Sequence, residues 1–306
     1  VYRAHHSMLR RPTAVKLLDE AKANEVTLRR FEREVQLTSQ LNHPNTVAIY
    51  DFGRTPEGVF YYAMEFLDGL TLQDLVARFG PQPEGRVIGI LRQICGSLAE
   101  AHEVGLVHRD IKPANVLINR RGGLFDFVKV VDFGLVKRTS ADDVALTQAN
   151  AITGTPLYMA PETIEKSDDV DHRADLYAVG AVGYFLLTGT TVFQSDNLFD
   201  LLRKQSHDVP ELPSLRCQCT VHPRLEQVLM DCLAKKPGDR PQSARELGER
   251  LAACDDATPW TDADARNWWK QYDSLQHPVT LAQTRNDAPS ATLIGSAKGD
   301  TARGHE

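Results

Sequence analysis

The spacing of hydrophobic and polar positions divides the chain into a short strand-rich part and a longer helix-rich part. Short runs typical of strands occur at Thr13–Leu18, Val47–Tyr50 and Val59–Met64. A Pro-Glu-Gly turn at 56–58 separates the last two runs. Between the first run and the second, Thr27–Leu41 carries apolar residues at roughly helical spacing. The pattern therefore predicts a small β-rich unit that contains one helix.

After Gly69 the pattern changes to the period of a helix. Glu84–Val104 has apolar residues at steps of three or four, which predicts a long amphipathic helix. From His277 to Glu306 large apolar residues are scarce, so we expect a disordered tail there. Further helices are predicted at Ala174–Leu187, Asn197–Gln205, Pro223–Ala234, Gln242–Ala252 and Thr261–Leu275.

The longest apolar run and the composition narrow the class of protein. Leu176–Leu187 is an apolar run of twelve residues, whereas a membrane span needs about 20. Hydrophobic residues are 42% and charged residues 25% of the chain, as in soluble globular proteins. With 35 basic and 41 acidic residues, the net charge of -6 argues against a nucleic-acid-binding protein. No basic-then-apolar leader follows Val1, so no signal peptide is expected.

The cysteines indicate a reducing compartment. There are 5 in the 306-residue chain, an odd number at low density, unlike the pattern of a disulfide scaffold. Cys217 and Cys219 form the one close pair, and no second pair of metal ligands lies near them in the sequence. A zinc site, which needs four ligands, is therefore not expected there.

Four short motifs that carry chemistry follow one another along the chain. His108–Asn115 reads HRDIKPAN, and DFG follows seventeen residues further on at Asp132–Gly134. APE stands at Ala160–Glu162, and AVK lies far upstream at Ala14–Lys16. In order and spacing these match the strand lysine, the catalytic loop, and the DFG and APE motifs of protein kinases. The chain therefore resembles the eukaryotic-like (Hanks-type) protein serine/threonine kinases of bacteria.

This resemblance covers residues 1–254 and implies the fold class. We expect an α+β protein kinase fold of two lobes, with a small antiparallel β lobe and one helix at 1–65. A larger, mostly α-helical lobe is expected at 70–254. A short linker with a tryptophan-containing helix would follow at 255–276, and a disordered tail at 277–306.

The resemblance assigns the phosphates of ATP to residues of the small lobe. Lys16 would bind the α- and β-phosphates, and Glu34 would hold Lys16 in place. Glu32 is the alternative to Glu34. On a helix the two lie about 200° apart, so only one of them can face inward.

The large lobe would provide the residues around the transferred phosphate. Phosphoryl transfer requires that Mg²⁺ neutralises the phosphate charge and that the attacking hydroxyl is aligned. By resemblance, Asp110 accepts or orients the hydroxyl proton, and Lys112 stabilises the moving γ-phosphoryl group. Asn115, also a catalytic residue, and Asp132 are oxygen ligands suited to Mg²⁺. Mn²⁺ is the alternative metal.

The adenine base requires an apolar slot with a few backbone hydrogen bonds. By resemblance, Met64 is the gatekeeper that precedes the hinge. The Glu65 carbonyl and the Leu67 amide would meet the adenine edge, while Ala14 and Leu117 would cover its two faces.

Two features favour protein Ser and Thr as the substrate. Lys112, two residues after the catalytic aspartate, is typical of kinases of this type, and so is the segment Gly154–Glu162. Within that segment, Thr155 would hydrogen-bond near Asp110 and Lys112.

A regulatory role is expected for Arg109 and for threonines of the activation segment. Arg109 precedes the catalytic aspartate, the arrangement of kinases that are switched by phosphorylation of this segment. Thr147 is the first candidate for that phosphorylation and Thr153 the next. Relatives often carry a second threonine two residues after the first, but here that residue is Ala149.

Three further residues match structural positions of the family. Asp175 would brace the backbone of the HRD motif, and Glu162 and Arg240 would form a buried ion pair.

The glycine-rich loop of the family, GxGxxGxV, is absent from these residues. Val1 aligns with its final valine and counts among the expected nucleotide-binding residues. We expect the chain to be an N-terminally truncated active kinase, because every catalytic residue that falls within it is present. The alternative is a pseudokinase or a scaffold for protein interactions, with weak or no catalysis.

The expected function is transfer of the γ-phosphate of ATP to serine and threonine hydroxyls of proteins, with autophosphorylation, in signal transduction. ATP, Mg²⁺ and protein substrates are the implied partners, together with a dimer of kinase domains. No nucleic acid and no membrane segment in this chain are expected. The expected location is the cytoplasm, either as a separate protein or as the cytoplasmic domain of a longer membrane-anchored kinase.

Overall fold

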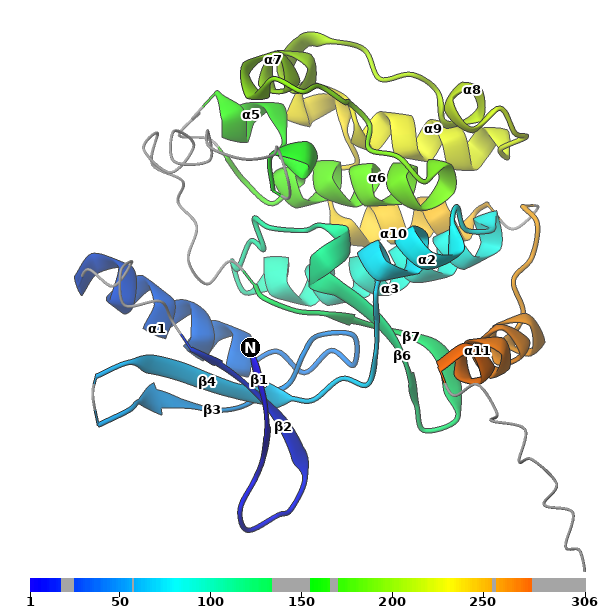
Figure 1. Cartoon of the computed structure of the whole chain (residues 1–306). Coiled ribbons are helices and arrows are strands. Elements are labelled where there is room, and N and C mark those ends of the chain that lie inside the picture. Colours follow the sequence, from blue (N-terminus) through cyan, green and yellow to red (C-terminus); the bar gives the residue numbers. More distant parts are fainter. Residues whose placement is uncertain (18–24, 57, 134–154, 166–169, 255–256, 277–306) are drawn as a thin grey trace, which may run out of the picture.

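The computed structural model describes residues 1–17, 25–56, 58–133, 155–165, 170–254 and 257–276 (Figure 1). The side chains of residues 25–31 and 155 are not among those described. The tail predicted at 277–306 lies outside the described residues.

The small lobe is built on one antiparallel sheet with strand order β1-β2-β4-β3. A helix, α1 (Glu25–Ser39), contacts this sheet at β3 (Figure 1). Lys16 of β2 is the register partner of Tyr62 in β4, and Ala14 is the partner of Met64. The strands are β1 (Tyr2–His5), β2 (Pro12–Leu17), β3 (Ile49–Arg54) and β4 (Phe60–Glu65).

The large lobe is mostly helical, and a second sheet with strand order β5-β6-β7 lies on its side toward the small lobe (Figure 1). These strands are β5 (Gly69–Thr71), β6 (Val116–Arg121) and β7 (Leu124–Val130). The helices are α2 (Leu72–Phe79), α3 (Glu84–Glu103), α5 (Pro161–Ile164), α6 (Arg173–Thr188), α7 (Leu198–His207), α8 (Pro213–Cys217), α9 (Pro223–Cys232), α10 (Ala244–Ala252) and α11 (Asp262–Gln276). Single 3-10 turns occur at η2 (Pro113–Asn115), η4 (Thr155–Tyr158) and η5 (Pro237–Asp239).

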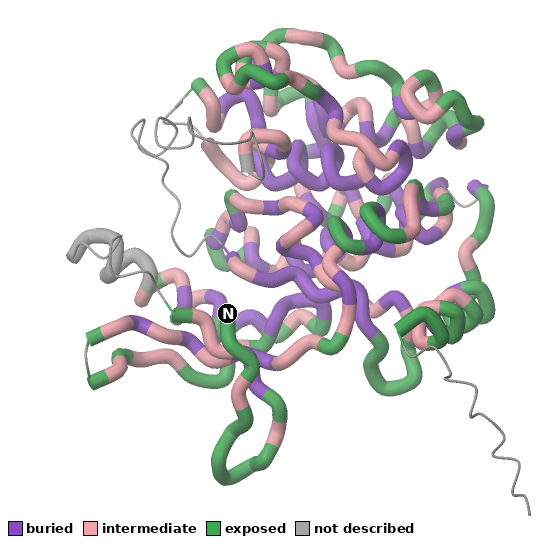
Figure 2. The backbone as a smooth tube through the Cα atoms, viewed as in Figure 1, coloured by how far each residue is buried: buried purple, intermediate pink, exposed green. Residues whose placement is uncertain are grey.

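Each lobe has its own hydrophobic core. The larger core is built around α3 and α6, whose buried residues fill the middle of the large lobe (Figure 2). The smaller core lies between the first sheet and α1 and contains Ala14, Val35, Val47, Phe60, Tyr62, Met64 and Val131. The two cores follow from the two hydrophobic patterns of the sequence, strand-like before Gly69 and helix-like after it.

Two glycines explain why the apolar run of α6 can be buried on nearly all sides. A Cβ atom at Gly180 would lie 2.5 Å from the Cβ atom of Cys232, and one at Gly183 would lie 2.5 Å from Leu229 Cδ2. Both neighbours belong to α9. The missing side chains therefore let α9 approach α6 closely.

The two-lobed α+β fold predicted from the sequence is confirmed. The predicted strands correspond to β2, β3 and β4, and the predicted helices correspond to α1, α3, α6, α7, α9, α10 and α11 within a few residues. The sheet β5-β6-β7 and helix α2 were not predicted, because their apolar runs are too short to establish a period.

The cysteine expectation needs one correction. Cys217 and Cys219 form a disulfide with a sequence separation of 2, although the chain was expected to hold reduced cysteines. This local bond closes only a very small loop and does not cross-link the fold. Cys95, Cys232 and Cys254 are free and buried. Within the described ranges, no helix combines the length and apolar character that a membrane crossing requires.

A buried ion pair joins α5 to the turn before α10. Arg240 Nη1 lies 2.7 Å from Glu162 Oε1, and Arg240 Nη2 lies 2.8 Å from Glu162 Oε2. The guanidinium also donates to three backbone carbonyls, those of Ala234, Arg173 and Lys235. The five hydrogen bonds satisfy the donors of a side chain that has no exposed surface.

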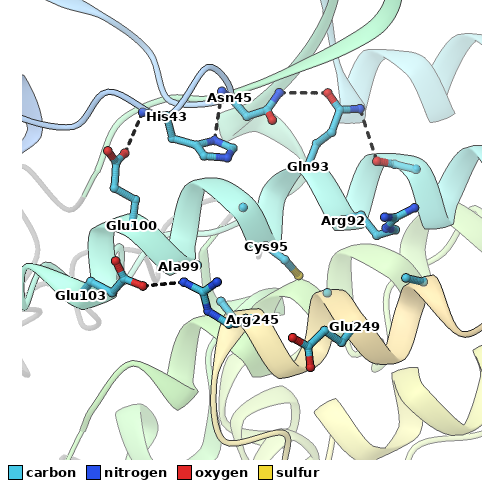
Figure 3. A pocket seen from close by; sticks show the side chains of 15 residues that line it. His43, Asn45, Arg92, Gln93, Cys95, Ala99, Glu100, Glu103, Arg245 and Glu249 are labelled. Atoms are coloured by element: carbon cyan, nitrogen blue, oxygen red, sulfur yellow. Dashed lines mark hydrogen bonds and ion pairs between the residues drawn. The ribbon is translucent and has the colours of Figure 1, made fainter.

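We predict that Arg240→Ala lowers the free energy of unfolding by about 3–5 kcal/mol, because it leaves the Glu162 carboxylate buried without its partner. Chemical denaturation followed by circular dichroism measures this loss. The matched control is Arg245→Ala. Arg245 pairs with Glu103 at 2.7 Å on the rim of an open cleft between α3 and α10 (Figure 3), and the two side chains are 68% and 64% exposed. Equal stability of the two variants would contradict the prediction.

Candidate active site

Lys16 and Tyr62 both reach Asp132, the first residue of the DFG motif. Lys16 Nζ lies 2.8 Å from Asp132 Oδ1, and the Tyr62 hydroxyl donates to the same oxygen at 2.6 Å. Their pairing in the β2–β4 register places both side chains on one face of the sheet. Burial, and then the charge of Asp132, raises the pKa of Tyr62 far above its ordinary value, so the phenol stays a donor.

Sequence reasoning missed Tyr62, although a signal for it existed. Tyr62 stands two residues before the predicted gatekeeper Met64, so both belong to the same face of a strand. Glu34 lies half-buried in α1, and its backbone carbonyl accepts a hydrogen bond from the Thr38 hydroxyl. Lys16 pairs with Asp132 in this conformation, and the pairing of Glu34 with Lys16 stays a prediction.

The three residues predicted from the HRDIKPAN motif form one hydrogen-bonded group. Lys112 Nζ lies 2.8 Å from Asp110 Oδ2, and Asn115 Nδ2 lies 2.9 Å from the same oxygen. The Asn115 amide also donates to the backbone carbonyl of Asp110 at 2.8 Å. Because the amide nitrogen faces Asp110, the Asn115 amide oxygen points away from it. The two donors fix the orientation of the Asp110 carboxylate.

Backbone contacts join this group to Asp132. The amide of Val131, the residue before Asp132, donates to the Asn115 carbonyl at 3.0 Å. The buried ring of His108 bonds the Val131 carbonyl through Nε2 at 3.1 Å and accepts from the Asp110 amide through Nδ1 at 3.3 Å. His108 also contacts the ring of Phe133, which is fully buried. The fold thus brings both halves of the predicted site together.

Asp175, in the first turn of α6, holds the backbone of the HRDIKPAN segment. Its carboxylate accepts from the amides of His108 and Arg109 at 2.8 Å each, and His102 Nε2 lies 2.8 Å from the same group. Arg109 has φ 62° and Asp132 has φ 60°, a left-handed backbone conformation that residues other than glycine rarely adopt. These contacts offset the strain of Arg109 and fix the direction of the residue that follows it.

The expected adenine slot is an apolar cluster between the lobes. Ala14 and Met64 are buried in the core of the small lobe, and Leu67 and Leu117 pack against it from the hinge and from β6. Val1 is 73% exposed, and its role at the nucleotide stays a prediction.

The side chain of Glu65 makes contacts that the sequence did not reveal. Its Oε1 accepts from the Ala48 amide at 2.9 Å and from the buried Lys129 ammonium, and its Oε2 lies 2.7 Å from Arg121 Nη1. Lys129 also donates to the Thr46 carbonyl at 2.9 Å. Burial lowers the pKa of Lys129, and the hydrogen bond to Glu65 opposes this shift. We call Glu65, Lys129 and Arg121 the hinge charge cluster.

Some expected residues fall outside what the structure describes. Thr147 and Thr153 lie outside the described residues. Thr155 begins η4, but its side chain is not among those described. Arg109 is exposed and precedes the catalytic loop aspartate.

The donors present fit a hard divalent cation that is also bound by phosphate. Asp132 offers a carboxylate and Asn115 an amide oxygen, and such oxygen ligands suit Mg²⁺. Nowhere in the described ranges do three or more His, Cys, Asp and Glu side chains gather as a metal site of their own. A cation that takes one or two protein ligands and completes its shell with phosphate oxygens and water fits this set.

Known proteins that are similar to this chain are protein kinases, as the arrangement of the candidate site also indicates. The protein kinase domain model matches residues 1–250. The serine/threonine-protein kinase pkn3 of Myxococcus xanthus is 39% identical over 302 residues, which cover 96% of this chain and 55% of pkn3. PknB of Mycolicibacterium smegmatis is 38% identical over 251 residues, which cover 81% of this chain and 39% of PknB. The chain thus spans about half or less of the length of these relatives.

Solved structures show the same fold. The kinase domain of Mycobacterium tuberculosis PknI matches with a TM-score of 0.64 and 29% identity, covering 82% of this chain and 88% of that one. Rad53, in complex with AMP-PNP, matches with a TM-score of 0.67 and 26% identity, covering 81% of this chain and 60% of that one.

The buried carboxylate of Asp175 makes a testable contribution to the pH dependence of stability. Burial alone would raise the pKa of Asp175, but the hydrogen bonds and charges of His102 and His108 outweigh it and hold this pKa below its ordinary value. A lowered folded-state pKa stabilises the fold above the unfolded pKa of about 3.9, and this contribution is lost as the pH falls further. Asp175→Asn should therefore destabilise the protein at pH 7, by an amount that shrinks below about pH 4.

Urea denaturation of both proteins between pH 3.5 and 7 measures the difference. The exposed Asp196→Asn is the control, which should follow the wild type at every pH. A gap between Asp175→Asn and the wild type that stays constant down to the acid limit would refute the assignment.

Proposed function

The chain belongs to the protein kinase family, and we propose that it transfers the γ-phosphate of ATP to serine and threonine hydroxyls of proteins. The observation that carries the proposal is the junction of two groups of side chains. Lys16 and Asp132 meet at 2.8 Å, while Asp110, Lys112 and Asn115 form a hydrogen-bonded group. One backbone hydrogen bond, from Val131 to Asn115, joins the two groups.

The proposed cofactors are ATP and Mg²⁺, with Mn²⁺ as the alternative metal. Bound Mg²⁺ would neutralise phosphate charge and orient the transferred group. Asp132 and Asn115 would hold the metal through their oxygens, and Lys16 would hold the α- and β-phosphates. Glu34 would position Lys16. Tyr62 fixes one oxygen of Asp132 and so supports the same site.

Asp110 would orient the substrate hydroxyl and receive its proton. Lys112 and Asn115 hold the Asp110 carboxylate in one orientation. The carboxylate therefore does not have to be ordered when the substrate binds. Lys112 would also stabilise the charge on the γ-phosphoryl group during transfer. Asp175, by its bonds to the backbone of His108 and Arg109, positions the loop without touching the substrate.

The base would lie in the apolar cluster between the lobes. Ala14 and Leu117 would cover its faces, and Met64 would close the slot at the back. The carbonyl of Glu65 and the amide of Leu67 would bind its edge. Backbone groups would make these contacts, so the hinge side chains would not touch the base themselves.

Protein serine and threonine are the proposed substrates. Lys112 and Thr155 occupy the positions typical of kinases of this type, and the relatives pkn3 and PknB are named serine/threonine-protein kinases. A cytoplasmic location, alone or as a domain of a longer anchored protein, and a dimer of kinase domains also belong to this proposal. So do a kinase domain at 1–254, a linker with a helix at 255–276 and a disordered tail at 277–306.

The phosphate-covering loop is part of the proposal. Residues 1–306 contain no Gly-x-Gly triplet, so the amides of a glycine-rich loop are not among them. Val1 would occupy the last position of that loop.

We predict that Asp110→Asn lowers phosphate transfer by about 10²–10⁴-fold, the usual contribution of a positioned acid or base. Transfer from radiolabelled MgATP to casein, with phosphoamino-acid analysis of the product, measures the rate and the residue type. Asp196→Asn, the same change at an exposed aspartate, is the control. A wild-type protein that binds ATP but transfers no phosphate would favour the pseudokinase alternative instead.

Autophosphorylation provides a second test. We predict phosphate on Thr147, or else on Thr153, after incubation with MgATP, because a phosphate there could pair with Arg109. Peptide mass spectrometry locates the phosphate, and the Asp110→Asn protein, in which it should be missing, is the control. An active enzyme without phosphate on the segment 137–153 would exclude this mode of regulation.

A further inference from the structure

The hairpin β6–β7 connects the proposed metal ligands with a distant part of the fold. Asn115 stands directly before β6, and Asp132 stands two residues after the end of β7. At the other end of the hairpin lies Asp126, about 20 Å away along an extended strand. Any contact that fixes Asp126 therefore acts on the element that carries Asn115 and Asp132.

The carboxylate of Asp126 is bound by four donors from three parts of the chain. Arg86 of α3 donates to both oxygens, at 2.9 and 2.7 Å. The indole of Trp260 donates to one oxygen and that of Trp269 to the other, both at 2.9 Å. Asp126 has φ 51°, a rare conformation for a residue with a side chain. Asp126 and Arg86 are buried, and Trp269 has only 1% of its surface exposed.

We call residues 257–276 the C-terminal clasp. In addition to its bonds with Asp126, the clasp contacts helices α2 and α3 of the large lobe. A Cβ atom at Gly85 would lie 2.5 Å from the Thr258 carbonyl oxygen and 2.6 Å from the Trp260 amide, so the clasp backbone crosses α3 at a glycine. Trp268 contacts Phe79 of α2 edge-on, with ring centroids 5.0 Å apart, and the Arg86 guanidinium lies 4.0 Å from the Trp268 ring centroid. Figure 1 shows α11 beside β6 and β7.

Neighbouring arginines of β6 connect the clasp with the hinge charge cluster. Arg120 Nη1 lies 2.5 Å from Asp273 of α11, and the Arg120 guanidinium lies 5.1 Å from the Trp269 ring centroid. Arg121 lies 2.7 Å from Glu65. The register of β6 with β7 shifts between Asn119 and Arg121, and the two neighbouring arginines contact different partners, the clasp and the hinge.

We propose that the C-terminal clasp is a positioning element of the nucleotide site, which holds the hairpin β6–β7 and through Arg121 and Lys129 the hinge at Glu65. The inference rests on the proposed function, because it assigns the clasp to the binding of ATP. Asp126, Trp260 and Trp269 are its positioning residues. Asp110 and Lys112 lie outside the hairpin, so we expect loss of the clasp to change the affinity for ATP more than the rate of the chemical step.

The test uses two glycines of the same helix in the full-length protein. Gly85→Ala forces the clasp backbone away from α3, whereas Gly89→Ala adds its methyl group in open space, with nothing within 4 Å. Both substitutions raise the helix propensity of α3 equally, so a difference in KM between the two variants is due to the clasp. We expect Gly85→Ala to raise the KM for ATP about fivefold or more while kcat changes less than about twofold, and Gly89→Ala to match the wild type.

Two further measurements separate positioning from loss of structure. Trp269→Phe removes one donor to Asp126 while keeping an aromatic ring, and it should raise the KM for ATP in the same direction at a temperature well below unfolding. Gly85→Ala combined with Arg121→Met should raise KM by less than the product of the two single effects, because both act through Glu65. Fully multiplicative effects would mean that the clasp does not act through the hinge and would overturn the proposal.

The two proposals fail in different ways. An active wild type with equal KM for ATP in the Gly85→Ala and Gly89→Ala proteins overturns the clasp and leaves the kinase function standing. Equilibrium binding of a fluorescent ATP analogue to the same proteins tests the clasp even where transfer is absent. If the wild type neither transfers phosphate nor binds the analogue, the proposed function fails and the clasp proposal fails with it.

Discussion

One buried carboxylate, that of Asp175, holds the centre of this structure together. It accepts hydrogen bonds from two successive backbone amides, those of His108 and Arg109, and so stabilises a left-handed residue directly before Asp110. Because Asp175 lies in the first turn of α6, a helix whose residues are nearly all buried, the HRDIKPAN segment is fixed to the core of the large lobe. A buried ionised group costs free energy unless it is fully hydrogen-bonded, and here the bonds that satisfy it are the ones that shape the loop.

The hairpin β6–β7 extends this rigidity from the loop to the rest of the site. Asn115 precedes the hairpin, Asp132 follows it, and Leu117 from its first strand packs under the apolar slot. Lys129 and Arg121 of the same hairpin hold Glu65 at the hinge. The proposed metal ligands, base slot and hinge therefore share one supporting element.

The sequence was most informative where a motif combines residue type with spacing. Lys16, Asp110, Asn115 and Asp132 could be named because kinase chemistry requires these groups in this order, and the fold brings them together. Contacts between side chains far apart in the sequence could not be named in the same way. Glu65 with Lys129, and Asp126 with two indoles, depend on strand register and helix packing, which no local pattern records. The disulfide between Cys217 and Cys219 was missed because an odd number of cysteines at low density is typical of proteins with reduced thiols.

Composition and packing give different information about the residues after Cys254. Composition changes near Asp255, where Asp, Thr and Pro replace the periodic apolar residues, and a boundary at 254 follows from that change. Residues beyond this boundary are nevertheless packed against the large lobe, because Trp269 and Ala265 are buried and the indoles of Trp260 and Trp269 donate to the Asp126 carboxylate. Without the clasp, Asp126 would lose two donors, and Arg86 would lose the aromatic rings of Trp260 and Trp268 that cover it. An unsatisfied buried charge is among the most costly features of a fold, so the contacts of the C-terminal clasp with Asp126 contribute to the stability of the large lobe.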